Sequence, residues 1–192
     1  MSGSDIFLDK QDYRVFLFYI YIYTHPSEEV ADRFSDLPKR LKDKTLFDQV
    51  NLLGFSILPD HFHLLIRQIA KDAMPKLLKQ VNNGYTAYFN HKYGRRGPVF
   101  AGRYKAVEVN DASLVDLVRY IHREPVEKKL VSEINEYEWS SFKRYIGQES
   151  LLNFDINPIM SKIGTQEDII RFHNDLVGYG ISLQAIEHLK IE

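Results

Sequence analysis

The 192-residue sequence contains no cysteine. This absence excludes disulfide scaffolds, zinc ribbons, iron–sulfur clusters and enzymes with a thiol nucleophile. Long apolar runs are also missing, because none reaches the roughly 18 residues that a membrane-spanning helix needs. The opening residues MSGSDIFLDK do not place a cationic region before an apolar one, so we expect no signal peptide. Together these absences predict a cytoplasmic protein without a membrane partner.

Net charge is also nearly absent, at −1, but the charges are unevenly distributed. Residues 71–129 carry 12 Lys and Arg against 6 Asp and Glu, a net charge of +6, whereas the flanking segments are acidic. A basic segment between acidic flanks predicts a local surface that binds phosphate groups. Solvated lysines on ordinary helices would explain the same pattern, so charge alone leaves both interpretations open.

The sequence is that of a globular chain, with 44% hydrophobic and 27% charged residues. Residues 49–57 and 61–68 are predicted as the two strands of a hairpin, separated by the turn signal Leu58-Pro59-Asp60. The segment 13–23 is almost uninterruptedly apolar and aromatic. Its composition favours a strand, but its length and a possible cap at Asp9 allow a buried helix.

Helices are expected on both sides of the loop 93–98. One covers about 73–92 with Asp72 as its cap, and a second begins after a cap at Asp111 and ends at Pro125. Between them, residues 99–109 are expected to be extended. Four further helical segments are expected toward the C-terminus, at 139–146, 156–163, 166–177 and 182–190. A sheet with separate helices predicts an α+β fold.

Two histidines form an H-x-H pair on the second predicted strand. Side chains at i and i+2 point to the same face, so the imidazoles of His61 and His63 can reach one cation. Two partly exposed histidines without a ligand are the simpler explanation of this pair alone. Tyr120 and Glu124 lie one turn apart on one face of the later helix. The charge of Glu124 is unfavourable near the C-terminal end of a helix, which indicates a partner, although such a pair also arises by chance.

These residues belong to four longer motifs, which follow one another as LPDHFHLLI, YTAYFNHKYGRRGPVFAGRYKAVEV, RYIHREPV and YEWSSFKRYIG. In these motifs the sequence resembles the Y1 (HUH, single-tyrosine) transposase superfamily, in particular the REP-associated tyrosine transposases related to the IS200/IS605 transposases. The resemblance extends from Asp5 to about residue 175. It implies a ferredoxin- or RRM-like HUH fold with a central antiparallel sheet flanked by helices, a transposase domain over 1–147 and a C-terminal helical extension over 148–192. It also favours the helix for residues 10–23.

The resemblance assigns roles to the residues singled out above. His61 and His63 match the two metal-binding histidines of the HUH motif, and Tyr120 matches the tyrosine nucleophile of the family's Y-I-x-x-N-P signature. Glu124 stands where relatives have Asn or Gln as the third metal ligand. A carboxylate also binds hard cations, so the resemblance implies one Mg²⁺ or Mn²⁺ ion held by these three residues.

The sequence departs from the family at its N-terminal side. Relatives have a strand that reads like Y-H-I-x-N-R-G before the I-F segment, whereas this sequence starts almost at Ile6-Phe7. We therefore expect the first strand of the family sheet to be absent.

The activity implied by the resemblance is metal-dependent cleavage and strand transfer of single-stranded DNA, on hairpin-containing substrates, by a monomer or homodimer. Cations around the YGRRGP loop are expected to contact the DNA, with aromatic side chains between them that can stack on bases. For Tyr85, Tyr88 and Phe89, packing in the core is the simpler explanation. The expected DNA-binding residues are Lys92, Arg95, Arg96, Arg103 and Lys105.

Two alternatives remain open from the sequence. In the first, the fold persists but catalysis has lapsed, and the protein only binds hairpin DNA; the expected loss of the first strand favours this possibility. In the second, the chain is an unrelated metal-dependent phosphoesterase that uses the H-x-H pair and has no need of Tyr120.

Overall fold

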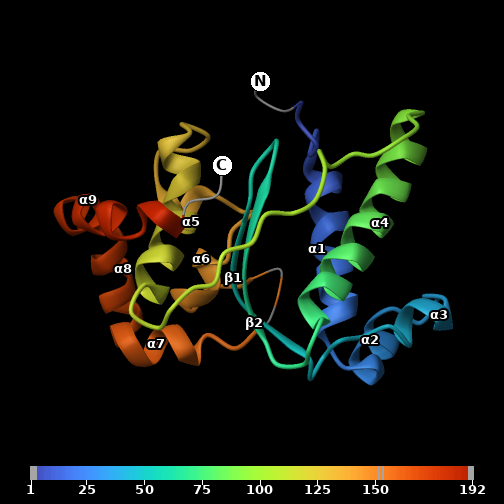
Figure 1. Cartoon of the computed structure of the whole chain (residues 1–192), viewed down its shortest axis with the longest axis horizontal. Helices are drawn as coiled ribbons and strands as arrows, with labels where there is room; N and C mark the ends of the chain where they lie inside the picture. The colour runs from blue at the N-terminus through green and yellow to red at the C-terminus, as the bar shows by residue number, and fades with distance from the viewer. Residues whose placement is uncertain (1–3, 151, 153, 190–192) are drawn as a thin grey trace. The chain divides into compact units, whose positions relative to one another are not determined.

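The computed structural model describes residues 4–150, 152 and 154–189, and helices and strands are both present in it (Figure 1). Two strands, β1 (Val50–Ile57) and β2 (Phe62–Gln68), form a two-stranded sheet. The predicted hairpin and the α+β class are therefore confirmed. Between residue 4 and the first helix no strand is present. The HUH-like arrangement of the family sheet stays a prediction.

The chain divides into two compact units. Both strands of the hairpin contribute residues to each of them. The boundary at residue 147 between a transposase domain and an extension is a separate prediction, which this division does not test. The first unit contains the described residues up to Leu52, Pro59–His61 and Ile66–Tyr104, and the second contains Leu53–Leu58, Phe62–Leu65 and the described residues from Lys105 onward.

The first unit is organised around two helices that lie side by side, α1 (Lys10–Thr24) and α4 (Ala73–Tyr93) (Figure 1). The apolar segment 13–23 is thus a helix, as the resemblance favoured. Its start is fixed by a capping box, in which the Asp9 side chain and the Asp12 side chain each accept hydrogen bonds from the other residue's backbone N–H. Two short helices follow α1, namely α2 (Ser27–Arg33) and α3 (Lys39–Lys42).

The contact between α1 and α4 combines a close approach with a buried carboxylate. At Gly84 of α4, a Cβ atom would lie 2.5 Å from the ring of Tyr19 on α1. The carboxylate of Asp12 is buried and accepts hydrogen bonds from the hydroxyls of Tyr88 and Tyr93, each at 2.8 Å. The last turn of α4 is therefore attached to the first turn of α1.

The second unit packs helices around α5 (Leu114–Glu127) and part of β1. A short segment pairs with β1 as an isolated antiparallel bridge between Ser56 and Ser140. The backbone N–H of Ile57 donates to Trp139 O, and that of Ser141 donates to Phe55 O, each at 2.9 Å. The remaining elements are α6 (Phe142–Tyr145), α7 (Asn157–Ile163), α8 (Gln166–Asn174), α9 (Leu176–Ala185) and 3₁₀ turns at Ile134–Glu136 and Glu187–Leu189.

Asp72 is the N-cap residue of α4, as predicted, although its backbone is left-handed with φ 60° and its side chain makes no cap hydrogen bond. Both predicted ends of the later helix were wrong. Asp111 forms an ion pair with Lys162, and the N-cap of α5 is Ser113. Pro125 does not end α5, which continues to Glu127. A proline lacks the N–H that would bond four residues back, so α5 loses one backbone hydrogen bond at Pro125 and still continues for two residues.

Residues 99–109 contain neither helix nor strand, so their extended conformation stays a prediction. One stretch differs in detail from the prediction. Near the C-terminus, α9 covers 176–185, where a helix end at 177 and a helix start at 182 were predicted. Residue 190, the predicted end of that last helix, lies outside the described residues. None of the described helices is long and apolar enough to cross a membrane.

The close approach at Gly84 predicts a position-specific effect of a single methyl group. Gly84→Ala places Cβ 2.5 Å from the Tyr19 ring, so we expect the free energy of unfolding to fall by about 1–3 kcal/mol. Urea unfolding should show this loss, and Tyr19→Ala should remove most of it in the double variant.

The matched control is Gly180→Ala on α9, where nothing lies within 4 Å of an added Cβ. There alanine should be neutral or should raise the free energy of unfolding by about 0.5–1 kcal/mol, since it only reduces the conformational entropy of the unfolded chain. Equal effects of the two substitutions would contradict the packing argument.

Candidate metal centre and tyrosine site

The H-x-H pair lies at the start of β2, with His61 directly before the strand and His63 as its second residue. Nδ1 of His61 is 2.7 Å from Oδ1 of Asp60. Because a carboxylate accepts, this nitrogen carries the proton and Nε2 is left as the ligand atom. A carboxylate that orients a histidine in this way is common beside protein-bound metals.

Glu124 contributes a carboxylate from α5. Its Oε2 lies 2.8 Å from Nε2 of His63, and its side chain is only 6% exposed. His61, His63 and Glu124 each offer a ligand atom, and these three atoms lie within 4.8 Å of one another. The structure thus brings together the three residues that the sequence predicted as a metal site.

The separation of the His63 and Glu124 atoms fits a shared ion. Two ligand atoms at about 2.1 Å from one ion and at right angles to each other are about 3 Å apart. The 2.8 Å between His63 and Glu124 is close to that value. Two imidazoles and a carboxylate are suitable ligands for a divalent ion and leave coordination positions for a phosphate oxygen.

Tyr120 lies beside this cluster. It is one turn before Glu124 on α5, it is half-buried, and its ring centroid is 6.1 Å from that of His63 at an interplanar angle of 67°. The predicted nucleophile and two of the predicted metal ligands are therefore neighbours within the second unit.

Two tyrosines of α4 could be considered as nucleophiles in place of Tyr120, but their hydroxyls are hydrogen-bonded within the first unit. Tyr85 is fully buried and donates to Ile6 O, and burial raises its pKa far above the ordinary range. Tyr88 donates to Asp12, and burial is the main cause that raises its pKa to about 12. These hydroxyls stabilise the first unit and are poorly suited to nucleophilic attack.

A series of hydrogen bonds between buried side chains of the second unit holds α5 in place. No pattern in the sequence predicted it. Nδ1 of His173 is 2.9 Å from Ile169 O, which can only accept, so this nitrogen carries the proton. Nε2 of His173 then accepts from Nδ1–H of His122 at 3.0 Å. Nε2 of His122 in turn accepts from the hydroxyl of Ser141 at 2.6 Å. For two neutral rings this pattern fixes both tautomers, and the Ser141 hydroxyl, which also lies 3.1 Å from Phe55 O, then gives its one proton to His122.

The environment of the two rings keeps them neutral. Burial lowers the pKa of His122 well below its usual value, and the neighbouring His173 adds to this effect. Burial also lowers the pKa of His173 to about 4, with smaller contributions from the positive charges of Arg119 and Arg123. Burial in the core, rather than a missing acceptor, therefore keeps both rings neutral, because Ser141 Oγ could also accept from His122 and donate to Phe55 O at 3.1 Å.

Two arginines of the basic segment also serve α5. The guanidinium of Arg119 is buried and donates to Phe172 O at 2.9 Å and Gly178 O at 3.1 Å. Arg123 donates to His173 O at 2.6 Å. These contacts tie α5 to α8 and α9, so both arginines are part of the folded framework.

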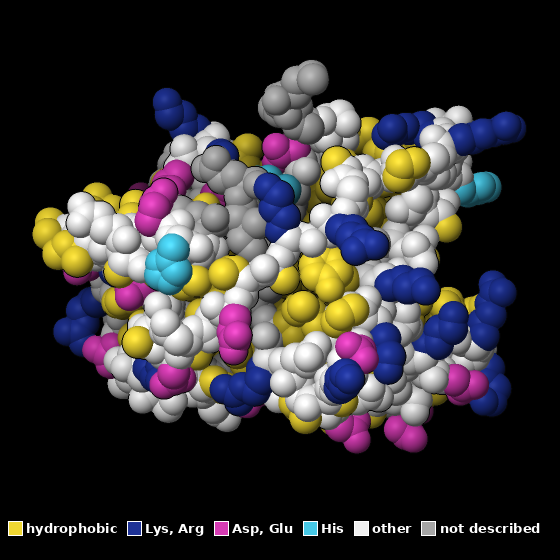
Figure 2. Space-filling model, in the orientation of Figure 1, with side chains coloured by type: hydrophobic (Ala, Val, Ile, Leu, Met, Phe, Trp, Pro, Cys, Tyr) yellow, Lys and Arg dark blue, Asp and Glu magenta, His cyan; other side chains and the backbone are white. Residues whose placement is uncertain are grey.

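The expected DNA-binding cations differ in their surroundings. Nζ of Lys92 lies 2.7 Å from Asp9 and 2.8 Å from Asp12, so this lysine is occupied within the first unit. Arg95, Arg96 and Arg103 are exposed. Figure 2 shows Lys and Arg side chains that border an apolar area over the N-terminal half of α4. Lys105 is exposed and belongs to the second unit.

A family model described as "Transposase IS200 like" matches residues 8–124. The chain belongs to this family. The matched region includes the hairpin with His61 and His63, continues through Tyr120 and ends at Glu124. No curated protein and no solved structure was found to match the chain. Membership of a transposase family makes DNA the expected partner and DNA processing the expected activity.

The lowered pKa of His173 predicts a dependence of stability on pH. Below about pH 6.5 the unfolded chain binds a proton at this ring, but the folded chain does so only near pH 4. The contribution of the neutral His173 ring to the free energy of unfolding is therefore complete above pH 6.5 and is lost as the pH falls toward 4. We expect His173→Gln to reduce this loss by on the order of 2–3 kcal/mol, measured by urea unfolding between pH 4 and 7.5.

The exposed His91 on α4 provides the control for this experiment. His91→Gln should retain the wild-type dependence of stability on pH. The interpretation fails if His173→Gln retains it as well, even where the variant is less stable at every pH.

Proposed function

We propose that this transposase cleaves single-stranded DNA in a metal-dependent reaction and rejoins it through a 5′-phosphotyrosine at Tyr120. The substrate is DNA that contains a hairpin, as the resemblance to REP-associated transposases suggests. The observation that supports this proposal most strongly is the contact of Tyr120 with His63, which itself faces Glu124 at 2.8 Å.

In this proposal His61, His63 and Glu124 hold one Mg²⁺ or Mn²⁺ ion. A bound divalent ion would polarise the scissile phosphate and offset the negative charge that develops on it. Asp60 orients His61 through its hydrogen bond to Nδ1. The mixed nitrogen and oxygen ligands favour Mn²⁺, because Mg²⁺ prefers oxygen ligands alone.

The chemistry exchanges one phosphodiester for another. The hydroxyl oxygen of Tyr120 forms a bond to phosphorus as the bond from phosphorus to the 3′ oxygen breaks. The phenolic proton is lost, and the leaving 3′ oxygen gains a proton to become a hydroxyl. In the reverse sense, a 3′-OH attacks the adduct and the tyrosine regains its proton. No external energy source is needed, because a phosphate ester bond is present before and after each step.

The DNA contacts of the proposal rest on the exposed cations. Arg95, Arg96, Arg103 and Lys105 are available to phosphates, and their neutralisation of phosphate charge supplies affinity that falls with salt. Lys92 receives a structural role instead, since two carboxylates already surround its ammonium group.

Tyr120→Phe removes one hydroxyl and should abolish covalent adduct formation. End-labelled single-stranded hairpin DNA is incubated with the protein and Mn²⁺ and separated on a denaturing gel. Wild type should yield an adduct at the 5′-phosphate and a fragment with a free 3′-OH, while Tyr120→Phe yields neither. DNA binding and Mn²⁺ binding should remain, because the hydroxyl is not among the predicted metal ligands.

Tyr19→Phe is the matched control, because it removes a hydroxyl from α1 in the first unit and should retain adduct formation. An adduct with Tyr120→Phe would identify another tyrosine as the nucleophile. If wild type binds hairpin DNA but forms no adduct with any hairpin, the chain is the binding-only protein. Cleavage that persists without Tyr120 and without an adduct would favour the metal-dependent phosphoesterase.

Loss of the two histidines should remove the metal site. Calorimetric titration with Mn²⁺ should show one site in wild type and none in the double variant His61→Ala, His63→Ala. Glu124→Gln keeps an oxygen ligand but loses its charge, so binding should weaken by roughly tenfold or more without disappearing. His91→Ala should bind as wild type does, whereas equal binding by the double variant would refute the site.

A further inference from the structure

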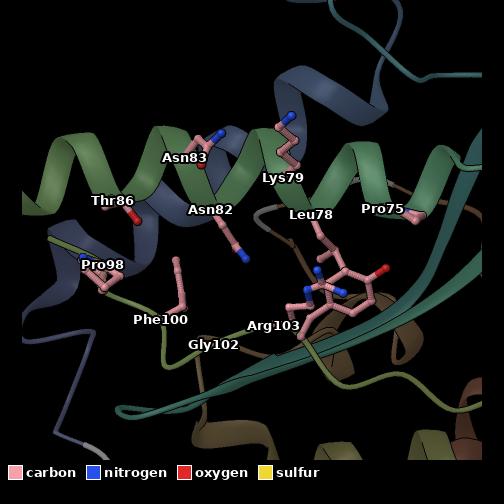
Figure 3. A pocket seen from close by; sticks show the side chains of 12 residues that line it. Pro75, Leu78, Lys79, Asn82, Asn83, Thr86, Pro98, Phe100, Gly102 and Arg103 are labelled. Atoms are coloured by element: carbon pink, nitrogen blue, oxygen red, sulfur yellow. The ribbon is translucent and has the colours of Figure 1, made fainter.

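An open groove of about 280 Å³ lies within the first unit, and of the expected DNA-binding residues Arg103 lines it (Figure 3). Side chains from α4 line one side, and residues 98–104 line the other. Within this segment Gly102 has φ 80°, a conformation that favours glycine and turns the chain along the groove.

The groove combines flat apolar surface with positive charge. Leu78 and Phe100 contribute its apolar surface, and Tyr104 lines it while remaining 40% exposed. Lys79 and Arg103 supply the charges, and none of the described residues that line the groove is acidic. Such surroundings suit a flat aromatic ring that is attached to a phosphate.

Asn82 supplies a polar group directed into this space. Its side chain extends from α4 toward the segment that carries Phe100 (Figure 3). Its Oδ1 is buried and has no hydrogen-bond partner among the described residues. A buried acceptor without a partner is unfavourable and uncommon, so a ligand that donates a hydrogen bond here would remove a deficit. The adjacent Nδ2 can donate at the same time, which matches the edge of a nucleobase.

We propose that this groove binds one unpaired nucleobase of the DNA strand. The amide of Asn82 reads the edge of the base, Tyr104 and Phe100 contact its face, and Lys79 and Arg103 contact the adjoining phosphates. This assignment rests on the proposed DNA function and adds a base-reading position to it. A free nucleotide of similar chemistry is the alternative source of the same ligand.

The experiment selects binders from a pool of single-stranded DNA in which a randomised segment flanks a hairpin. Tyr120→Phe protein without added metal is used, so that binding is measured without cleavage. We expect the selected strands to share a preferred base at one position. Asn82→Ala should lose the preference at that position and retain every other preference.

Affinities for a selected strand and for its copy with an abasic site at that position then test the contact directly. The abasic copy should bind about tenfold more weakly to the parent protein. Tyr104→Ala should lower affinity for the intact strand by a similar factor and leave affinity for the abasic copy unchanged. The side chain of Tyr104 is 40% exposed, so its removal should spare the fold, which the unfolding temperature checks.

Two control variants separate base contact from general attraction. His91→Ala removes an exposed polar side chain of α4 that does not line the groove, and should bind like the parent. Arg96→Ala should weaken binding to the intact and abasic strands equally, and its affinity should depend less on salt.

The possible failures are distinguishable. If the parent protein binds no DNA in the pool, the proposed function fails and this assignment fails with it. If the protein binds DNA and neither Asn82→Ala nor Tyr104→Ala alters base preference or the abasic penalty, the DNA function stands and the groove assignment is overturned. Competition by free mononucleotides at concentrations that match strand affinity would also overturn it, in favour of a separate nucleotide site.

Discussion

The chain of hydrogen bonds from Ser141 through His122 to His173 determines what the second unit can present. His122 lies midway between Tyr120 and Glu124 on α5, and each residue of a helix turns the side-chain direction by about 100°. Tyr120 and Glu124 therefore both lie about 160° around the helix from His122 and about 40° from each other. Because both ring nitrogens of His122 are bonded and its side chain is fully buried, the rotation of α5 about its own axis is fixed. The buried face thus aims the tyrosine and the carboxylate in a common direction.

This constraint depends on residues outside the part of the chain that matches the family. The match ends at Glu124, whereas the partners of α5 come from Ser141, from His173 on α8 and from the carbonyl of Gly178 on α9. The C-terminal helices consequently help to hold the site in place, because they supply acceptors to three buried or half-buried polar side chains of α5, those of Arg119, His122 and Arg123. A buried guanidinium or imidazole that loses its partner is strongly destabilising, which makes these helices integral to the second unit.

The sequence predicted what depends on short-range pattern and missed what depends on distant partners. The hairpin, α4 and α5 follow from turn residues and from apolar spacing, and the H-x-H pair follows from the two-residue period of a strand. The helix α1 was ambiguous because its apolar residues surround the whole helix, which removes any periodicity. His122 and His173 are 51 positions apart in the sequence, and Lys92 and Asp12 are 80 apart, so no local pattern encodes either contact. The cap predicted at Asp111 was wrong: its carboxylate pairs with Lys162, which is distant in the sequence, and Ser113 is the N-cap of α5.

Partners that are distant in the sequence also occupy several cations of the basic segment 71–129. Its net charge of +6 includes Lys92, which Asp9 and Asp12 neutralise, and Arg119 and Arg123, which are bonded to carbonyls of the second unit. Fewer cations are left for phosphates than the sequence suggests, so charge neutralisation alone gives a weaker and less salt-dependent attraction. Affinity for a single strand must then draw more on stacking and on hydrogen bonds to bases, which are short-ranged and little affected by salt. On the first unit, the exposed Arg95 and Arg96 lie in the sequence between Asn82 and Tyr104, which both line the groove, so the attraction of phosphates and the contact with a base occur on one continuous stretch of chain.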